Sequence, residues 1–354
     1  MNRETSAVRA GEDLDVSRVR DHLAAAGIGD LDSALSVEQF RGGSSNLTYL
    51  VKVDGEEYVL RRPPFGNTVR SAHDMKREFR VLAKLAKVYP PAPKVLLFCD
   101  DISVIGSEFY LMERRRGVIL RAEVPAEIAS SPRLQRAVCE SLMQNLARLH
   151  SLDIEAAGLA DLGDPDGYCR RQVEGWTRRY FAAKTHDWPE LESAIEWLNA
   201  NIPAESGAAL IHNDHKFDNV MLDPADLTRV VAVLDWEMAT VGDPLMDLGT
   251  TLGYWIGREG GEEMLNMPFN PRVLRETISR AELVEMYSAA AGRDVGDMLF
   301  YYVFGLFKIA VIAQQIYARY ARGFTTDARF ARFDHFVSGL GRLAAVSIEN
   351  GSIE

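Results

Sequence analysis

The chain contains few cysteines and no excess of positive charge. Its 354 residues include only three cysteines, Cys99, Cys139 and Cys169, and no two of them form a CxxC pair. Scattered cysteines predict reduced thiols and a cytoplasmic protein. The formal net charge of −11 argues against a nucleic-acid partner, because binding to phosphates requires a basic surface. A local group of arginines inside an acidic protein can still bind a small anion.

Long apolar runs are also scarce. The N-terminal residues are polar and charged, so we predict no secretory signal. The most apolar segment covers residues 299–316, which is short for a membrane span, and it contains Lys308, Gln314 and Gln315. We therefore expect a buried helix there and no membrane partner. The sequence leaves open whether the chain is a monomer or a homodimer.

The composition is that of a soluble globular protein, with 47% hydrophobic and 26% charged residues. The chain is long enough for two lobes that each have a core. Changes in residue pattern predict an N-terminal extension over residues 1–36, which includes a short helix near 16–25. A small β-rich lobe over 37–113 and a larger helical lobe over 114–354 follow, and the arginine-rich stretch 114–117 is the predicted hinge.

The pattern predicts strands in the first third of the chain and long helices afterwards. The Asp54-Gly55 pair is typical of a hairpin turn. A helix is expected over residues 71–88, with Ser71 and Asp74 resembling a capping box at its start. The predicted strands cover residues 37–40, 47–53, 58–61, 95–99 and 109–112, and the later helices cover 132–152, 167–185, 188–201, 280–291 and 297–321.

Residues 211–219 form the most informative stretch of the sequence. His212, Asp214 and Asn219 have the spacing of the H-R-D-x-x-x-x-N loop that carries out phosphoryl transfer in protein kinases. His212 is expected to anchor the backbone of this loop rather than to act as a base. The stretch therefore suggests metal-assisted phosphoryl transfer.

The strands that follow this loop support the same interpretation. Residues 219–222 and 230–234 are rich in apolar and β-branched side chains and are expected to pair as an antiparallel hairpin. The start of the first strand would then lie beside the end of the second, which brings Asn219 next to Asp235, with Asp214 just before them. Oxygen-bearing side chains of this kind are the ligands that Mg²⁺ prefers.

Four motifs in this order resemble a known family. They are GSSNLTY over residues 43–49, YVLRRP over 58–63, LARLH over 146–150 and LDWEMATVGDPLMDL over 234–248. The chain resembles the aminoglycoside phosphotransferase and choline kinase family, over about residues 37–340. More narrowly, it is similar to the phosphotransferase domain of acyl-CoA dehydrogenase family members ten and eleven. The resemblance implies an α+β, protein-kinase-like fold with a small antiparallel β N-lobe and a larger, mainly helical C-lobe.

The resemblance implies roles for residues near the 211–219 stretch. Asp214 would accept or orient the proton of the substrate hydroxyl, and Lys216 would neutralise charge on the γ-phosphate. Asn219 and Asp235 would hold Mg²⁺ that bridges the phosphates of ATP. The implied cofactors are therefore ATP and Mg²⁺, although GTP in place of ATP stays open.

The resemblance also implies a nucleotide site in the first lobe. Arg61 occupies the position of the strand lysine that contacts the phosphates, and Glu78 would pair with it. Backbone N–H groups of the glycine turn would bind phosphates, and the 112–113 segment would present backbone groups to adenine. The residues expected to contact the nucleotide are Gly43, Ser44, Ser45, Asn46, Arg61, Glu78, Met112 and Glu113.

Two positions depart from the family pattern. The strand lysine is replaced by Arg61, and the neighbouring Arg62 is an alternative, since strand alternation places only one of the two on the phosphate side. Asn213 stands where most of the wider family has glycine. Around the loop, His150 is expected to be structural and Asp247 to hydrogen-bond the loop backbone. His215 is expected at the surface or facing the substrate.

The leading hypothesis is a kinase that transfers the γ-phosphoryl group of ATP to a hydroxyl of a small molecule. The narrower resemblance indicates a hydroxyacyl-CoA or hydroxy acid as the acceptor. Alternatives are an aminoglycoside or amino-alcohol kinase, or a nucleotide-binding pseudokinase, for which the change from lysine to Arg61 is the only support. A metal-dependent phosphohydrolase is a further alternative, but such sites usually use more His and Asp ligands at separated positions.

Overall fold

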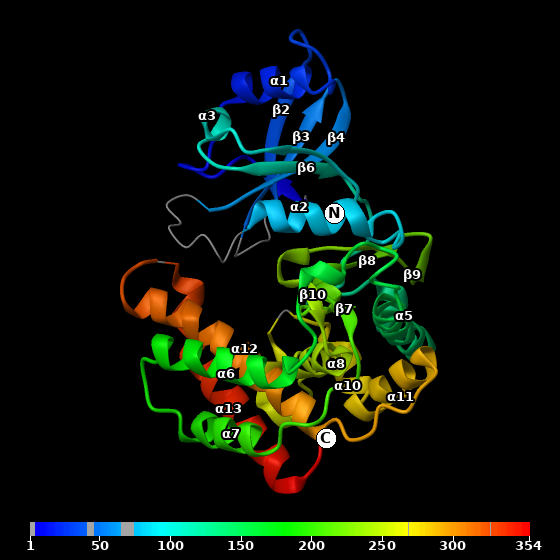
Figure 1. The fold of residues 1–354 in the computed structure, drawn as a ribbon, viewed down its shortest axis with the longest axis vertical. Coiled ribbons are helices and arrows are strands. Elements are labelled where there is room, and N and C mark those ends of the chain that lie inside the picture. The colour runs from blue at the N-terminus through cyan, green and yellow to red at the C-terminus, as the bar shows by residue number, and fades with distance from the viewer. Residues whose placement is uncertain (1–3, 41–45, 65–73, 268, 326) are drawn as a thin grey trace. The chain divides into compact units, whose positions relative to one another are not determined.

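The chain divides into two compact units in the computed structural model. The N-terminal unit comprises residues 1–116 together with 232–237, and the C-terminal unit comprises 117–231 and 238–354. The division after Arg116 falls inside the arginine-rich stretch expected to be a hinge. The structure describes residues 4–40, 46–64, 74–267, 269–325 and 327–354 (Figure 1).

A six-stranded antiparallel sheet forms the N-terminal unit, with strand order β1-β2-β3-β4-β6-β5. Five of these strands are the ones that the sequence predicts, and β1 is added at the edge beside β2. Asp54 and Gly55 connect β3 to β4 with φ angles of 50° and 90°, as the predicted hairpin turn requires. The strands are β1 (Thr5–Ser6), β2 (Leu35–Phe40), β3 (Leu47–Val53), β4 (Glu56–Arg62), β5 (Val95–Cys99) and β6 (Phe109–Glu113).

The segment predicted to be an extension is part of the core of this unit. Helix α1 (Val16–Ala25) has the predicted bounds and is capped by Asp15, whose side chain accepts a hydrogen bond from the backbone of the first turn. Val19 and Leu23 are fully buried in the same apolar cluster as Tyr49 of the sheet. Burial of this apolar face, which the sequence pattern contains, holds the segment on the sheet.

Helix α2 (Met75–Leu85) also packs on the sheet, beside β5 and β6 (Figure 1). Asp74 is its N-cap and accepts a 2.8 Å hydrogen bond from the N–H of Arg77. The described helix therefore begins four residues after the predicted start, because Asp74 caps the helix instead of lying inside it. Ser71 lies outside the described residues. Glu78 is in the first turn and is buried.

The C-terminal unit is mainly helical. Its five longest predicted helices are present within two residues of their expected bounds. Helix α8 was not predicted because all of its residues are buried, so it has no amphipathic period. The helices are α4 (Ala126–Ala129), α5 (Pro132–His150), α6 (Tyr168–Ala183), α7 (Pro189–Ala200), α8 (Pro244–Gly253), α9 (Gly261–Leu265), α10 (Arg272–Thr277), α11 (Arg280–Ala291), α12 (Leu299–Ala321) and α13 (Phe333–Asn350), and the N-terminal unit adds the short α3 (Ile102–Ile105).

Helix α12 is the centre of this unit. It packs against α6, α7, α8 and α13 (Figure 1). Its length and composition would suffice to cross a membrane, but 78% of its most apolar window is buried inside the protein. Among the described residues it is the one helix that passes this test, and we interpret it as a core helix, which is the structure expected from the sequence.

Two short sheets enclose the loop that the sequence singles out. Strand β7 (Ala209–Ile211) enters the loop and pairs antiparallel with β10 (Thr240–Gly242). Strand β8 (Val220–Asp223) leaves the loop and pairs with β9 (Asp226–Val233), which is the predicted hairpin. Residues 212–219 are therefore held at both ends by hydrogen-bonded strands.

Two glycines allow α8 and α12 to approach closely. A Cβ atom added at Gly305 would lie 2.2 Å from the backbone oxygen of Gly249, and one added at Gly249 would lie 2.2 Å from the backbone oxygen of Tyr301. Distances this short cannot be relieved by a side-chain rotation, because the opposing atoms are backbone. The two glycines thus allow the backbones of α8 and α12 to pack in direct contact.

We predict that Gly305→Ala separates these helices and lowers the unfolding free energy by about 1–3 kcal/mol. Gly175→Ala in α6 is the matched control, since its added Cβ would meet no atom closer than 3.7 Å. Alanine there should keep or raise stability, as it is the better helix former. Thermal unfolding followed by circular dichroism checks both variants. Equal melting temperatures for Gly305→Ala and the wild type would contradict the predicted overlap.

Candidate active site

Arg61 of β4 is the centre of a charged cluster in the N-terminal unit. Its Nη1 lies 3.1 Å from Glu78 Oε1 of α2, which is the predicted ion pair. Its Nη2 lies 2.9 Å from Asp235 Oδ1 and 3.8 Å from Glu237 Oε2. Arg61 is 7% exposed and Glu78 is 1% exposed. One buried guanidinium thus contacts three carboxylates.

The segment that carries Asp235 is fixed within this unit. The N–H of Val233 donates to the Pro91 carbonyl at 2.9 Å. Trp236 is buried and packs edge-on against Tyr89, with ring centroids 5.9 Å apart. These contacts explain why residues 232–237 belong to the N-terminal unit although their neighbours in sequence do not.

The choice between Arg61 and Arg62 is decided by strand alternation. Arg62 points to the opposite face of β4, where its Nη1 donates to the Ile105 carbonyl at 2.8 Å. Arg61, on the other face, is the one that forms an ion pair with Glu78. Arg61 is therefore the arginine that pairs with the helix glutamate, and its contact with phosphates stays a prediction.

The carboxylates of this cluster keep the guanidinium of Arg61 protonated. Burial acts to lower the pKa of Arg61, but Glu78 and the other carboxylates raise it well above its usual value. Burial raises the pKa of Glu78, against the opposing charge of Arg61, and Asp235 raises it further. Removing the guanidinium would leave a buried carboxylate without its counter-charge, which is costly.

Asn46 is the one residue of the predicted glycine turn that lies within the described residues. Gly43, Ser44 and Ser45 lie outside the described residues. Asn46 is 3% exposed, and its Nδ2 donates to Glu237 Oε2 at 2.8 Å, which attaches the end of the glycine turn to the Arg61 cluster. Its predicted contact with phosphate stays a prediction.

Met112 and Glu113 end strand β6. Met112 is paired with both neighbouring strands and is 7% exposed. The N–H of Glu113 donates to the Lys94 carbonyl at 2.9 Å, and its carboxylate accepts from the Lys94 N–H at 2.8 Å. The N–H of Glu113 is thus used by the sheet, and the predicted adenine contact of this segment stays a prediction.

In the C-terminal unit, Asp247 organises the 212–219 loop. It lies in the first turn of α8, is fully buried, and accepts hydrogen bonds from the N–H groups of His212 at 2.6 Å and Asn213 at 2.7 Å. His150 Nε2 lies 3.1 Å from the same carboxylate, and its Nδ1 lies 2.7 Å from the hydroxyl of Tyr287. The supporting roles expected for Asp247 and His150 are confirmed.

Asn213 explains the departure from glycine in this loop. Its φ angle is 67°, in the left-handed region where glycine is usual and asparagine is the best-tolerated substitute. The next N–H, that of Asp214, donates to His212 Nδ1 at 3.2 Å, so His212 anchors the loop as expected. Asparagine can therefore replace glycine here without a change of backbone path.

The carboxylate of Asp214 is contacted by two residues of its own loop. Lys216 Nζ donates to Asp214 Oδ2, and the Asn219 amide nitrogen donates to the same oxygen at 2.7 Å and to the Asp214 carbonyl at 2.9 Å. Lys216 also lies 4.7 Å above the ring of Tyr254. The amide nitrogen of Asn219 is thus used within the loop, and its predicted role as a metal ligand stays a prediction.

His215 does not lie where the sequence predicts. It is fully buried instead of facing solvent or substrate, and its Nε2 lies 3.1 Å from Asn145 Oδ1 of α5. Its carbonyl accepts a 2.9 Å hydrogen bond from Thr251 Oγ1 of α8. Burial, and next the charge of His212, lower the pKa of His215 to about 3, so it is neutral at physiological pH.

Sequence reasoning missed three residues that support the loop. Asn270 accepts the Phe217 N–H at 3.0 Å, and Thr251 holds the His215 carbonyl as described above. Lys308 of α12 donates from its Nζ to the Asn213 carbonyl at 2.7 Å. Only Lys308 had a signal in the sequence, since it is a charge inside an apolar run; Asn270 and Thr251 had none.

The three arginines at the predicted hinge are used in ion pairs. Arg114 lies 2.6 Å from Glu57, Arg116 lies 2.7 Å from the same carboxylate, and Arg115 lies 2.8 Å from Glu113. All three arginines thus contact carboxylates of the N-terminal unit.

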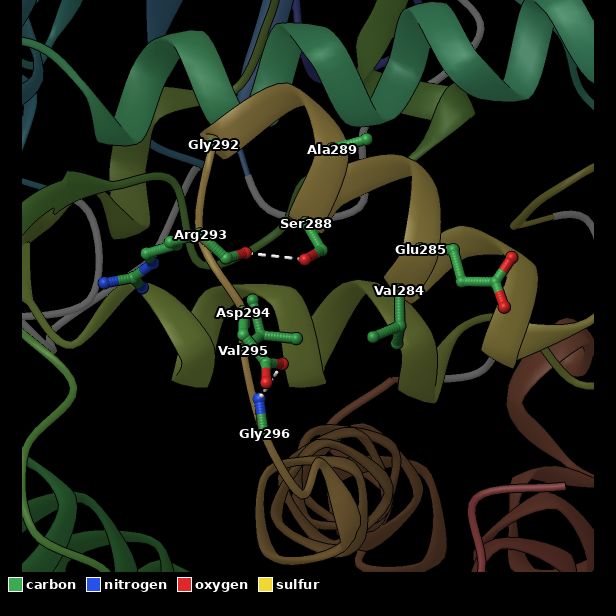
Figure 2. A pocket seen from close by; sticks show the side chains of 9 residues that line it. All are labelled: Val284, Glu285, Ser288, Ala289, Gly292, Arg293, Asp294, Val295 and Gly296. Carbon is green, nitrogen blue, oxygen red and sulfur yellow. Dashed lines mark hydrogen bonds between the residues drawn. The ribbon is translucent and has the colours of Figure 1, made fainter.

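A hollow of about 580 Å³ lies at the end of α11, far in sequence from the loop residues (Figure 2). Two hydrogen bonds lie within its turn: Ser288 Oγ donates to the Arg293 carbonyl, and the Gly296 N–H donates to Asp294 Oδ1. Arg293 Nη1 donates to the Ser206 carbonyl at 3.1 Å. No residue predicted for the site lines this hollow, which is bordered by Val284, Glu285, Ser288, Ala289, Gly292, Arg293, Asp294, Val295 and Gly296.

The antiparallel N-terminal sheet, the helical C-terminal unit and the loop around Asp214 define a protein-kinase-like phosphotransferase fold. Residues 36–298 match the phosphotransferase enzyme family. Because the match covers most of the chain, this chain belongs to that family, and the predicted α+β fold class and family are confirmed.

Two relatives of this chain are much longer proteins. Acyl-CoA dehydrogenase family member 11 of Gallus gallus is 38% identical over 300 residues, which are 82% of this chain and 37% of that protein. Acyl-CoA dehydrogenase family member 10 of Mus musculus is 33% identical over 317 residues, which are 86% of this chain and 28% of that protein. The chain thus spans well under half the length of these relatives.

Solved structures share the fold. A Ralstonia eutropha protein assigned to the aminoglycoside phosphotransferases is 30% identical with a TM-score of 0.78, and the comparison covers 96% of this chain and 99% of that one. Choline kinase from Cryptosporidium parvum is 12% identical with a TM-score of 0.58, covering 90% of this chain and 91% of that one. The latter likeness concerns the fold alone.

We predict that the buried His215 makes the protein less stable in acid. The unfolded chain protonates this histidine below about pH 6.5, whereas the folded protein does so only near pH 3. The unfolding free energy should therefore fall as the pH drops from 6.5 toward 3, by up to about 1.4 kcal/mol per pH unit from this group.

Urea unfolding between pH 7 and pH 4 measures this effect. His215→Gln, which keeps an N–H donor for Asn145, should show a flatter pH dependence than the wild type. His186→Gln replaces an exposed histidine and is the control that should follow the wild type. An unchanged slope in His215→Gln would show that the buried imidazole does not determine acid stability.

Proposed function

We propose that this chain is an ATP- and Mg²⁺-dependent kinase that transfers the γ-phosphoryl group to a hydroxyl of a small molecule. The observation that carries the proposal is the arrangement around Asp214, whose carboxylate is oriented by Lys216 and Asn219 in a loop held by buried side chains. A buried, rigid loop that directs one carboxylate suits a reaction in which positioning and charge neutralisation lower most of the barrier.

In the proposed reaction, the acceptor hydroxyl oxygen attacks the γ-phosphorus while the bond to the bridging oxygen breaks and ADP leaves. Asp214 orients the hydroxyl and accepts its proton. Lys216 compensates negative charge on the transferred group, and the ring of Tyr254 helps to hold its ammonium in place. These are the roles that the family resemblance implies for Asp214 and Lys216.

Asn219 and Asp235 are the proposed ligands of Mg²⁺. The amide oxygen of Asn219 and the carboxylate of Asp235 are oxygen donors of the kind that Mg²⁺ selects, so the residues fit the ion. They belong to different units, and their pairing is proposed from the sequence pattern. When bound, the ion neutralises charge on the phosphates of the nucleotide.

The nucleotide is proposed to bind through the N-terminal unit. Arg61 would contact the phosphates while Glu78 fixes its direction, as a lysine does in protein kinases. Asn46 and the glycine turn before it would bind phosphate, and the Met112–Glu113 segment would contact adenine. The retained Arg61–Glu78 pair weighs against the pseudokinase alternative, since the only support for that alternative is the change of lysine to arginine.

The acceptor is proposed to carry negative charge, as a hydroxyacyl-CoA or a hydroxy acid does. The cations of the C-terminal unit around Asp214 support this proposal. Lys216 contacts Asp214, and Arg179 of α6, which is exposed, lies 4.6 Å above the ring of Trp176 in the same unit. A cationic aminoglycoside or amino alcohol would be repelled by such a group.

The proposed setting is the cytoplasm. All three cysteines, Cys99, Cys139 and Cys169, are buried and none is in a disulfide. Burial raises the pKa of each thiol. Buried, protonated thiols are inert, as expected for structural residues in a reducing compartment.

We predict that Asp214→Asn lowers kcat by about 10²–10⁴-fold, because it removes the group that accepts the proton. The assay is magnesium-dependent ADP release from ATP across hydroxyacyl-CoAs, free hydroxy acids, aminoglycosides and amino alcohols. Asp218→Asn is the matched control, since Asp218 belongs to the same loop but forms an ion pair with Arg121. If ATP binds but no acceptor stimulates its turnover, the pseudokinase alternative is favoured.

We also predict that Arg179 contributes to recognition of the acceptor. Arg179→Ala should raise KM for an anionic acceptor roughly 10-fold with little change in KM for ATP, which corresponds to the loss of one charge-assisted hydrogen bond. Arg178→Ala removes the adjacent exposed arginine of α6 and serves as the control. A preference for aminoglycosides or amino alcohols in the wild type would overturn the proposed acceptor class.

A further inference from the structure

Lys308 is the charged residue within the apolar stretch 299–313 of helix α12. It is 1% exposed, and its Nζ donates to the Asn213 carbonyl at 2.7 Å, to Asn213 Oδ1 at 3.1 Å and to Thr250 Oγ1 at 3.5 Å. All three acceptors lie in or beside the catalytic loop. The ammonium group is therefore satisfied entirely by neutral oxygen atoms.

These contacts fix the peptide group that joins Asn213 to Asp214. Its carbonyl oxygen accepts from Lys308, and its N–H donates to His212 Nδ1 at 3.2 Å. The side chain of Asn213 is held too, because its Oδ1 accepts from Lys308 and its Nδ2 donates to the Met238 carbonyl at 3.1 Å. With both ends of the peptide bonded, the direction in which Asp214 leaves the backbone is determined.

Burying a lysine in this place is costly for stability. Burial lowers the pKa of Lys308 to about 8, and the charges that face it are Asp247 and Asp214, which raise it, and Lys216 and Arg179, which lower it. A methionine or leucine would fill the same space in α12 without this desolvation penalty. Packing of the helix therefore gives no reason for a lysine here.

We infer that Lys308 is a positioning residue for the proposed reaction. It holds Asn213 in its left-handed conformation and thereby directs the Asp214 carboxylate. Asp247 holds the N–H groups on one side of the loop, and Lys308 holds the carbonyl and amide oxygens of Asn213 on the other. The inference rests on the proposed function of Asp214. It adds a residue that is 94 positions away in sequence and belongs to another element.

The decisive variant is Lys308→Met, which keeps the length and apolar stem but removes the donor. Gln314→Met is the matched control, because Gln314 is equally buried in α12 but bonds to Ala183 and Thr185 instead of the loop. Lys308→Met should lower kcat by at least about 10-fold and leave KM for ATP within about twofold. Gln314→Met should lose stability but keep kcat.

Hydrogen exchange gives a second measurement that does not depend on turnover. In Lys308→Met, the amides of residues 212–214 should exchange at least about 10-fold faster than in the wild type, whereas in Gln314→Met they should not. If the wild type shows no kinase activity, the proposed function fails while the exchange data still test whether Lys308 holds the loop. Unchanged exchange, or an unchanged kcat in an active enzyme, would overturn the inference.

Discussion

The candidate site depends on the hydrogen bonds that the buried carboxylate of Asp247 accepts. This carboxylate accepts the N–H groups of His212 and Asn213 and is itself held by His150, which Tyr287 supports in turn. Although burial would raise its pKa, these hydrogen bonds and the charges of His150 and His212 keep the pKa of Asp247 well below its usual range. The carboxylate at the start of α8 thus fixes the position of the first two residues of the loop.

Both units use buried charge to fix polar side chains. In the C-terminal unit an anion on α8 and a cation on α12 both bond to Asn213, and Gly249 and Gly305 bring the helices that carry them into close contact. In the N-terminal unit the Arg61 guanidinium joins β4, α2 and the segment that carries Asp235. Charged side chains are rarely buried without partners. These clusters therefore mark positions where the orientation of a polar side chain matters more than apolar packing.

The secondary structure could be predicted wherever a segment has one buried face. The strands β2–β6 and the amphipathic helices follow from their periodicity, and α1 was found with its observed bounds. Prediction failed for α8, which is buried on every side, and for α13, where Gly339 and Gly341 lower the helix signal but allow contact with Met264 and Leu191. That α1 joins the core of the sheet depends on contacts between segments, which periodicity does not report.

The sequence by itself determined which residues are proposed to carry the chemistry, because the spacing of Asp214, Lys216 and Asn219 is local and a short loop can place such residues in only a few ways. Tertiary structure decided what surrounds them. It placed Arg61 instead of Arg62 beside Glu78, buried His215 against α5, and brought Lys308 to the loop from a helix almost a hundred residues later. These contacts arise from the packing of distant elements, and no local pattern in the chain records which elements will meet.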